Sequence, residues 1–289
     1  MIKEKPFDKD KYRKILFDTF DSFIKICEEY GINYFCAGGT VLGAVRHKDM
    51  IPWDDDVDVF MKQVDYEKFI ALDEELQKKG FSVICAQNSE KSATFGKFYN
   101  MNTTLWEFKE IPFVYGVYID IFPLYESCDT LEVFLKKYKT LRNAQRMYQL
   151  SQMRFSFSDI IHYYKNGDKK YFYKGLLSYL FPRFLSSYYR QYLIKCEDAF
   201  KGQIGDKMVC PYGEYFKKEY QEKSWYEDYV LMPFGPLYVR VPKDYEAFLK
   251  YVYGDYMKLP PKEKRVSHHY HYFLDLSKGM TMEEIKNKI

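Results

Sequence analysis

The chain has 289 residues, of which 47% are hydrophobic and 29% charged, with a formal net charge of +3 at pH 7. This length and composition predict a sizeable core and exclude a long disordered tail, and so small a charge gives no support for nucleic-acid binding. Aromatic residues reach 20%, which suits ordinary packing or contacts with sugars, lipids and quaternary ammonium groups.

The cysteines and the first residues indicate the compartment. The six cysteines include no CxxC pair, which argues against a structural zinc site and favours reduced thiols. The opening MIKEKPFDKDKYRK lacks the apolar segment of a signal peptide. No stretch approaches the roughly 20 apolar residues of a membrane span. We therefore expect a cytoplasmic protein.

The first part of the chain alternates between helical and strand patterns. The expected elements are a helix over 9–30, a strand over 32–37, a helix over 40–47, a strand from 56, a helix over 64–79, and strands over 81–86, 94–99 and 117–122. Thr40 is expected to cap the second helix, and Pro123 to close the last strand. This order predicts a mixed α/β sheet with flanking helices.

The rest of the chain reads differently. Residues 130–200 are helical, with aromatic and basic residues interleaved, which suits either ordinary packing or a face lying on an anionic membrane. A strand over 237–241 and a helix ending near Gly254 follow. We expect a catalytic core over 1–130, a helical extension over 131–235, and a C-terminal part over 236–289 that completes the core.

Four aspartates crowd into residues 54–58, between apolar runs. In a strand, Asp56 and Asp58 project from one face, about 7 Å apart, while the valines between and after them face the core. Carboxylates this close repel unless a cation neutralises them, and Mg²⁺ suits oxygen ligands. Asp120 lies alone between two isoleucines, so a neighbouring strand could bring it to the same site.

A glycine pair precedes the acidic strand. Gly38 and Gly39 lie just before a short helix, where the backbone can approach a phosphate closely. Arg46 and Lys97 are candidate phosphate ligands. His47 is more readily explained as a histidine near a helix C-terminus.

Weaker candidates lie elsewhere. A basic loop near the C-terminus has the side chains Arg265, His268, His269 and His271. It could face an anionic ligand, although plain solvation explains it equally well. Trp53 and Trp106 could contact a quaternary ammonium group or simply pack.

The acidic stretch resembles the LicD family, which includes the fukutin-type transferases, within the nucleotidyltransferase superfamily. The family pattern of a GG turn, a short LLGAxRH-type helix and IPWDDDxD stands here as AGGTVLGAVRHKDMIPWDDDVDVFM. Three further matches support it: GKFYN with a nearby Thr103, YIDIFPL, and VPKDYEAFLKYVYGDYMKLPPKEKR. The middle helical segment matches no motif.

The resemblance implies a nucleotidyltransferase-like fold and a function. LicD-like proteins transfer phosphocholine, or a related phospho-alcohol, from a CDP-activated donor to a hydroxyl of a surface glycan such as teichoic acid, capsule or lipopolysaccharide. By resemblance, Asp56, Asp58 and Asp120 hold Mg²⁺ or Mn²⁺. The residues that would bind the donor are Gly38, Gly39, Thr40, Arg46 and Lys97. Asp120 or Asp55 could deprotonate the acceptor.

Two alternatives stay open. A nucleotide-sugar glycosyltransferase also uses a DxD metal site, although here the acidic strand comes early and directly follows a glycine turn. A catalytically silent module could bind a glycan or a partner protein. The resemblance favours a cytoplasmic enzyme, peripheral at the inner membrane face, that acts on a lipid-linked glycan and does not bind nucleic acid.

Overall fold

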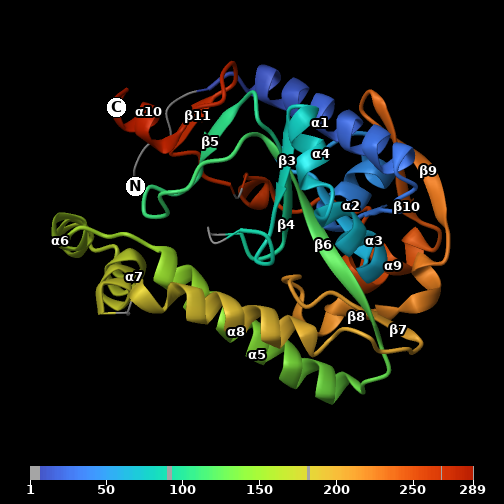
Figure 1. Cartoon of the computed structure of the whole chain (residues 1–289). Coiled ribbons are helices and arrows are strands. Elements are labelled where there is room, and N and C mark those ends of the chain that lie inside the picture. Colours follow the sequence, from blue (N-terminus) through green and yellow to red (C-terminus); the bar gives the residue numbers. More distant parts are fainter. Residues whose placement is uncertain (1–6, 90–92, 181–182, 268, 289) are drawn as a thin grey trace.

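A computed structural model describes residues 7–89, 93–180, 183–267 and 269–288, in which helices and strands alternate (Figure 1). The helices are α1 (Lys9–Glu29), α2 (Gly38–Arg46), α3 (Gln63–Ile70), α4 (Asp73–Lys78), α5 (Leu131–Gln152), α6 (Phe157–Lys165), α7 (Lys169–Leu180), α8 (Ser186–Asp198), α9 (Tyr245–Tyr253) and α10 (Met282–Lys286). The strands are β1 (Phe35–Cys36), β2 (Asp58–Lys62), β3 (Phe81–Ile84), β4 (Gly96–Asn100), β5 (Thr104–Trp106), β6 (Tyr118–Ser127), β7 (Lys207–Val209), β8 (Tyr220–Glu222), β9 (Tyr229–Phe234), β10 (Leu237–Pro242) and β11 (Phe273–Asp275).

Seven strands form one mixed sheet in the order β1-β2-β6-β4-β3, with β7 and β8 added at the far end of β6. β2 and β6 run parallel, whereas β4 is antiparallel to both β6 and β3. This arrangement confirms the predicted mixed α/β fold. It also puts Asp120 at the centre of the sheet, with β2 on one side of it and β4 on the other.

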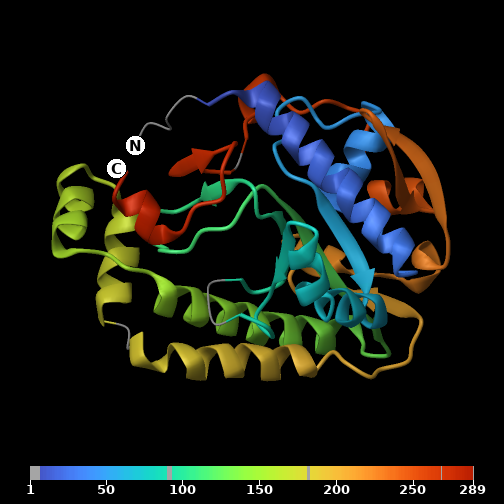
Figure 2. The same ribbon diagram turned by 45° about the horizontal axis from the view of Figure 1, so that its top comes forward.

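Helix α1 packs across one face of the sheet (Figure 2). Its buried residues recur at helical spacing, and Phe23 contacts the rings of both Phe69 and Phe98. Asp8 caps the first turn by accepting the N–H of Lys11 at 2.9 Å. The predicted helix is confirmed to within a residue at its C-terminal end, where Glu29 is the last helical residue.

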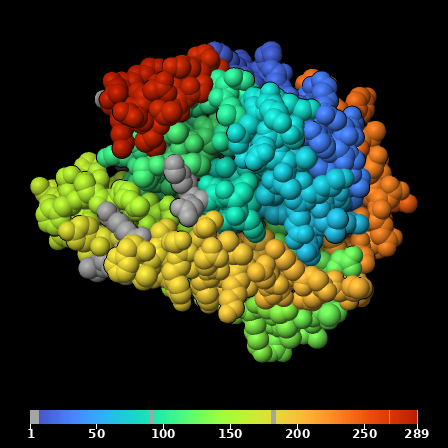
Figure 3. Space-filling model, viewed as in Figure 1, coloured from blue at the N-terminus to red at the C-terminus, as the bar shows by residue number. Residues whose placement is uncertain are grey.

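Helices α5 and α8 lie side by side along the sheet (Figure 2). Phe134, Leu141 and Leu193 are fully buried and form a second hydrophobic cluster around Tyr125 of β6. Ordinary packing therefore explains these two helices. By contrast, α6 and α7 project from the body of the molecule (Figures 1 and 3). Among the described residues, no helix is both long enough and apolar enough to cross a membrane.

The start of the acidic motif differs from expectation. Helix α2 begins at Gly38 with Ala37 as its N-cap, so the prediction of Thr40 as the cap is wrong. Thr40 lies inside the helix, where its hydroxyl accepts the N–H of Asp58 at 2.9 Å. The strand begins at Asp58, which leaves Asp56 in the preceding loop. This hydrogen bond, which Asp58 N donates, ties helix α2 to the first residue of β2.

Two further expectations were wrong for tertiary reasons. The helix expected over 64–79 is divided, because the Asp73 carboxylate accepts hydrogen bonds from Ser82 Oγ and Val83 N of β3, both at 2.8 Å. Pro123 does not close its strand. It lies where β6 has left β4 and has not yet met β7, so its missing N–H interrupts neither of these pairings.

The C-terminal part follows its prediction more closely. The strand expected over 237–241 is β10, and the helix that follows is α9, ending before Gly254 at a φ of 71°. Strand β9, which pairs with β10, was missed because Pro233 interrupts its apolar run. Strand β11 was also missed, since its three residues pair with β5 from the other end of the chain.

Candidate functional site

A cavity of about 1260 Å³ is lined by β2, β4 and β6, by the start of α2, and by α5, α7 and α9. Acidic residues of its lining include Asp54, Asp56, Asp58, Glu107 and Asp120. Basic residues of its lining include Lys97 of β4, together with Arg142, Arg146 and Lys174 of α5 and α7. The fold therefore gathers the predicted carboxylates at one cavity and sets basic helices around it.

Asp58 and Asp120 are register partners on the parallel strands β2 and β6. Adjacent strands lie about 5 Å apart, so the two carboxyl groups are neighbours. Val57 and Val59 are fully buried, as the alternation predicts. Burial, and then the charges of Asp56 and Asp120, raise the pKa of Asp58 well above its usual range. The expectation that the two acidic strands are adjacent is confirmed.

Lys97 is the cation beside this pair. Its Nζ lies 2.7 Å from Asp120 Oδ1 and 3.6 Å from the centre of the Tyr118 ring. The side chains of Lys97 and Asp120 are only 15% and 9% exposed. Burial raises the pKa of Asp120 to about 6, although Lys97 opposes the shift. Burial disfavours the charge of Lys97, but Asp120 and Glu107 raise its pKa overall.

Glu107 is a cavity residue that sequence reasoning missed. It accepts hydrogen bonds from the hydroxyls of Tyr115 and Tyr118, the second at 2.6 Å. Burial acts to raise the pKa of Glu107, but Lys97 and the two hydroxyls outweigh it and lower the value. No local signal marks this residue, because it follows the short strand β5, which depends on β11 for its pairing.

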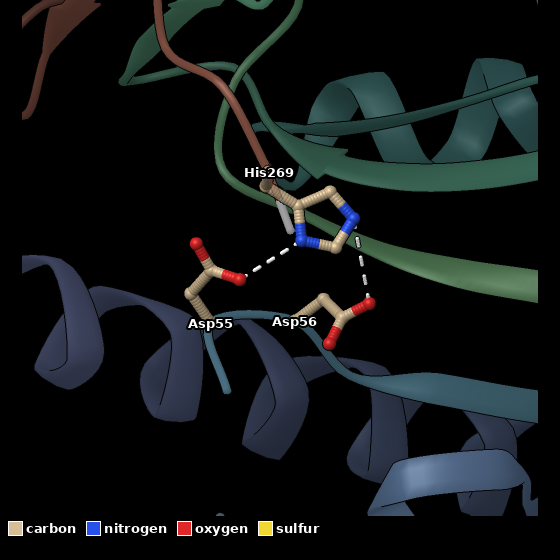
Figure 4. Close-up of side chains that lie close together, drawn as sticks. All are labelled: Asp55, Asp56 and His269. Carbon is tan, nitrogen blue, oxygen red and sulfur yellow. Dashed lines mark hydrogen bonds and ion pairs between the residues drawn. The ribbon is translucent and has the colours of Figure 1, made fainter. Parts of the chain in front are cut away.

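His269 reaches the acidic loop from the C-terminal segment (Figure 4). Its Nδ1 lies 2.9 Å from Asp55 Oδ1, and its Nε2 lies 3.6 Å from Asp56 Oδ2. Burial acts to lower the pKa of His269, but the bond to Asp55 and the charge of Asp56 raise it to about 10, so the ring is a cation. Ser267 donates to the second Asp55 oxygen at 2.6 Å.

Asp55 has a different position from the one its sequence neighbours suggest. His269 lines the cavity, whereas Asp55 is not among the described residues that do so. Burial acts to raise the pKa of Asp55, but hydrogen bonds from His269 and Ser267 outweigh it and lower the value. Asp55 thus holds the imidazole in place, and any contact between Asp55 and a ligand would run through His269.

Asp54 completes the acidic stretch. It is largely buried, and burial followed by the charge of Asp56 raises its pKa to about 8. Asp54 is therefore more easily protonated than a solvated aspartate. The aspartates of this loop differ in environment, since the pKa of Asp54 is raised whereas Asp55 is paired with a histidine that lowers its pKa.

Gly38 and Gly39 open α2 at the edge of the cavity. Gly38 has a φ of 48°, and a Cβ there would lie 3.3 Å from Asp58 Oδ2. A Cβ on Gly39 would lie 2.7 Å from Asp54 Oδ2, closer than such contacts occur. Both glycines therefore leave room between the carboxyl groups and the helix start, as a close-approaching ligand would need.

Two residues expected near the phosphates lie elsewhere. Thr40 and Arg46 are not among the described residues that line the cavity. Thr40 supports the backbone of Asp58, and Arg46 donates to the Tyr256 carbonyl at 2.8 Å. Their roles in donor binding stay predictions.

The two candidate tryptophans differ. Trp53 lines the cavity, and the Arg265 guanidinium lies 5.4 Å from the centre of its ring. Trp106 is buried and donates its indole N–H to the carbonyls of Phe108 and Ile111, at 2.6 and 2.8 Å. Trp106 is therefore a packing residue.

The other two described histidines among the candidates make ring contacts. His47 packs edge-on against Trp53, with ring centres 6.1 Å apart. His271 is buried against the rings of Phe7 and Tyr12. His268 lies outside the described residues.

The donor set fits a divalent cation. Carboxylate oxygens are the ligands that Mg²⁺ prefers, and Mn²⁺ accepts them too. In the described part of the chain no side chain donates a hydrogen bond to the Asp58 carboxylate. Asp55, Asp56 and His269 each offer one possible metal-ligand atom, and these three atoms lie within 4.8 Å of one another. In this structure Lys97 and His269 supply the positive charge that Asp120 and Asp56 require.

The chain is similar to known transferases. Residues 31–160 match the family model described as LicD/FKTN/FKRP, nucleotidyltransferase domain. The lipopolysaccharide cholinephosphotransferase LicD of Haemophilus influenzae is 27% identical over 264 residues, which cover 88% of this chain and 93% of that protein. The ribitol 5-phosphate transferases FKRP of Mus musculus and Homo sapiens are each 44% identical over 46 residues, 16% of this chain and 9% of theirs. Residues 31–160 therefore match the nucleotidyltransferase domain of the LicD family, and most of the chain is similar to a LicD protein.

Proposed function

We propose that this protein is a transferase that moves a phospho-alcohol, phosphocholine by preference, from a CDP-activated donor to a hydroxyl of a surface glycan. The observation that carries the proposal is the register pairing of Asp58 with Asp120 beside the glycine start of α2, at one cavity. The match to the family model and the cholinephosphotransferase relative support the reaction class. The relative's name also supports lipopolysaccharide, or a similar glycan, as the acceptor class.

In this proposal Asp56, Asp58 and Asp120 hold Mg²⁺ or Mn²⁺. The metal, when bound, would stabilise the negative charge that develops on the donor pyrophosphate. The role suits Asp58 best, since its carboxyl group has a raised pKa and no hydrogen-bond donor among the described residues. A cation would remove the repulsion that raises that pKa.

The donor would lie between the glycines and Lys97. The start of α2 presents backbone N–H groups to an anion, and Lys97 offers an ammonium group on the other side of Asp120. The cavity also contains aromatic side chains that suit a quaternary ammonium group, namely Trp53, Phe108, Phe113 and Tyr115. This combination of phosphate and cation contacts favours a choline-bearing donor.

The transfer itself is a displacement at phosphorus. The acceptor hydroxyl oxygen bonds to the phosphorus that bears the alcohol, the bond from that phosphorus to the pyrophosphate bridge breaks, and CMP leaves. The hydroxyl proton passes to a carboxylate, for which Asp120 is placed in the cavity. Asp55 would act as base only through His269. If Asp55→Ala keeps full turnover at saturating metal, Asp55 is not the base.

Gly39→Ala is expected to lower the rate of CMP release at limiting donor about tenfold or more, because the new Cβ must displace Asp54 from its place beside α2. Gly39 has an ordinary helical φ, so the melting temperature should change little. Initial rates over a range of donor concentrations and a thermal unfolding curve provide the measurement. Wild-type rates in this variant would show that the space above Gly39 is not used by the donor.

The first experiment measures CMP release from CDP-choline, CDP-ethanolamine, CDP-glycerol and CDP-ribitol, with Mg²⁺, Mn²⁺ or EDTA, for the wild type and Asp56→Ala. We expect metal-dependent release from CDP-choline that Asp56→Ala loses. Release of a free sugar from a nucleotide sugar would favour the glycosyltransferase alternative. No turnover together with no metal-dependent binding of any CDP donor would favour the silent binding module.

We also infer a cytoplasmic setting. All six cysteines are free thiols, and Cys27, Cys36, Cys85 and Cys210 are buried. Such thiols suit a reducing compartment. A CDP-activated donor would be available on the same side of the membrane.

A further inference from the structure

The segment from α6 to the start of α8, residues 157–180 and 183–188, is called here the aromatic arm. It presents large apolar side chains to solvent: Phe157 is 69% exposed, Tyr164 70%, Phe184 86% and Tyr188 63%. Figure 3 shows its yellow-green part, α6 and α7, projecting at the left edge of the molecule. So dense an exposed apolar surface is unusual unless something covers it.

The exposed side chains form faces that are distinct from the packed ones. On α6, Phe157, Ile161 and Tyr164 recur at helical spacing on the outer face. Ile160 lies beside this row on the helix and is buried, where Gly175 of α7 allows close approach, since a Cβ there would lie 3.0 Å from Ile160 Cγ1. The packing of α6 on α7 therefore uses Ile160 and leaves the three exposed side chains for another surface.

The outer faces of the two helices are continuous. The Tyr164 ring contacts Phe172, and Phe172 contacts Tyr173, with ring centres 5.3 Å apart in each case. Tyr173, Leu176 and Tyr179 continue the exposed row along α7. The arm thus offers one apolar strip across two helices.

The charge of the arm identifies the kind of surface that it fits. Its sequence contains five Lys or Arg and two Asp. Of the two acids, Asp159 pairs with Lys109 at 2.9 Å and Asp168 accepts the N–H of Tyr171 in the first turn of α7. Lys169 and Lys170 are exposed. Exposed aromatics among lysines suit the interface of an anionic bilayer.

Helix α7 links this surface to the candidate site. Lys174 and Leu177 of α7 line the cavity, while Tyr173 and Tyr179 of the same helix are exposed. A helix lying on a bilayer would therefore hold one side of the cavity next to the lipid. That position suits an acceptor that is itself attached to a lipid.

We propose that the aromatic arm docks the protein on an anionic lipid bilayer and holds the cavity against it. The docking needs only the arm, whereas the presentation of a lipid-linked acceptor rests on the proposed transfer to a glycan. A second copy of the chain is a poorer occupant, because pairing two such arms would bring two sets of lysines together.

The test uses the full chain without donor or metal, so that it is independent of the transferase proposal. Sedimentation with sucrose-loaded vesicles is compared for pure phosphatidylcholine and for phosphatidylcholine with roughly 30 mol% phosphatidylglycerol. We expect binding to the anionic vesicles that falls with salt. Tyr164→Ser with Phe184→Ser should reduce the bound fraction at least about tenfold, and Lys169→Glu with Lys170→Glu should have a similar effect.

A matched control removes exposed apolar groups elsewhere. Leu231→Ser with Tyr238→Ser alters the β9–β10 hairpin, where the two side chains are 55% and 69% exposed, and should bind vesicles like the wild type. Circular dichroism checks that each variant is folded. The proposal is overturned if the wild type stays in the supernatant, if the hairpin control loses binding equally, or if sedimentation velocity shows a dimer that only the Tyr164/Phe184 variant loses.

Discussion

Asp58→Asn is expected to reduce CMP release by about a thousandfold or more, and yet to raise the free energy of unfolding of the metal-free protein by about 1 kcal/mol. The two effects share one cause. Burial and the charges of Asp56 and Asp120 raise the pKa of the Asp58 carboxyl group, so its ionised form destabilises the folded state. Asparagine keeps the shape and removes the charge that a metal would need.

The sign of the stability change follows from the raised pKa. A carboxyl group with a folded-state pKa above its unfolded value costs stability increasingly as the pH rises from the unfolded value to the folded value. The gain from Asp58→Asn should therefore be larger at pH 8 than at pH 5. Urea unfolding in EDTA at both pH values, with CMP release measured in parallel, provides the test.

Asp10→Asn is the matched control, since Asp10 is exposed in the first turn of α1, on the surface of the protein. It should change neither turnover nor the pH dependence of stability by much. A loss of stability in Asp58→Asn, or full turnover, would contradict the assignment of Asp58 to a metal-binding carboxylate cluster. Full turnover in particular would remove the observation on which the proposed function depends.

Lys97→Met is expected to have the opposite effect on stability, with a loss of about 3 kcal/mol at pH 8 in EDTA. The substitution removes the ammonium group 2.7 Å from Asp120 and leaves that carboxylate buried without its ion-pair partner. Burial already raises the pKa of Asp120 to about 6 with Lys97 present, so the value should rise further without it. The loss should shrink as the pH falls and Asp120 takes up a proton.

Added Mg²⁺ should restore part of this stability, because a bound cation would replace the missing positive charge. Urea unfolding with and without Mg²⁺, at pH 8 and pH 5, checks both effects. Lys79→Met is the control: its partner Glu29 lies at 2.5 Å, but both side chains are well exposed, so the loss of stability should be much smaller than in Lys97→Met. A pH-independent loss in Lys97→Met would mean that its packing on Tyr118, not its charge, matters.

Much of the site could be predicted from local sequence patterns. Apolar and polar residues alternate at Val57, Asp58 and Val59. Because successive side chains of a strand point to opposite faces, this pattern predicts that the two valines are buried, as the structure confirms. Gly38 and Gly39 predict a backbone that a phosphate can approach closely; in the structure the carboxylates of Asp58 and Asp54 lie close to them, and the phosphate contact stays a prediction. The lone Asp120 between isoleucines required a partner, which the neighbouring strands supply.

Other features of the site could not be predicted from the local sequence. Residues 131–235 contain no short motif that predicts a site, and yet helix α5 places Arg142 and Arg146 in the cavity lining. Arg142 is held there by hydrogen bonds to Gln145 and to the carbonyl of Tyr212, at 2.8 and 3.2 Å, and Tyr212 lies 70 residues further along the chain. The exposure of the aromatic arm was likewise hidden, because the same composition fits a packed helix or a surface one.

The sequence by itself determined the resemblance to the LicD family, the mixed α/β class and the acidic strand pair, since these depend on short-range spacing and on the chemistry of neighbouring residues. The tertiary structure alone decided what neutralises and positions the carboxylates. His269 joins Asp55 and Asp56 across more than two hundred residues, and Glu107 enters the cavity through a strand whose partner is near the C-terminus. Such contacts depend on chain crossings that no local pattern encodes, because a buried charge selects whichever partner the fold brings within reach.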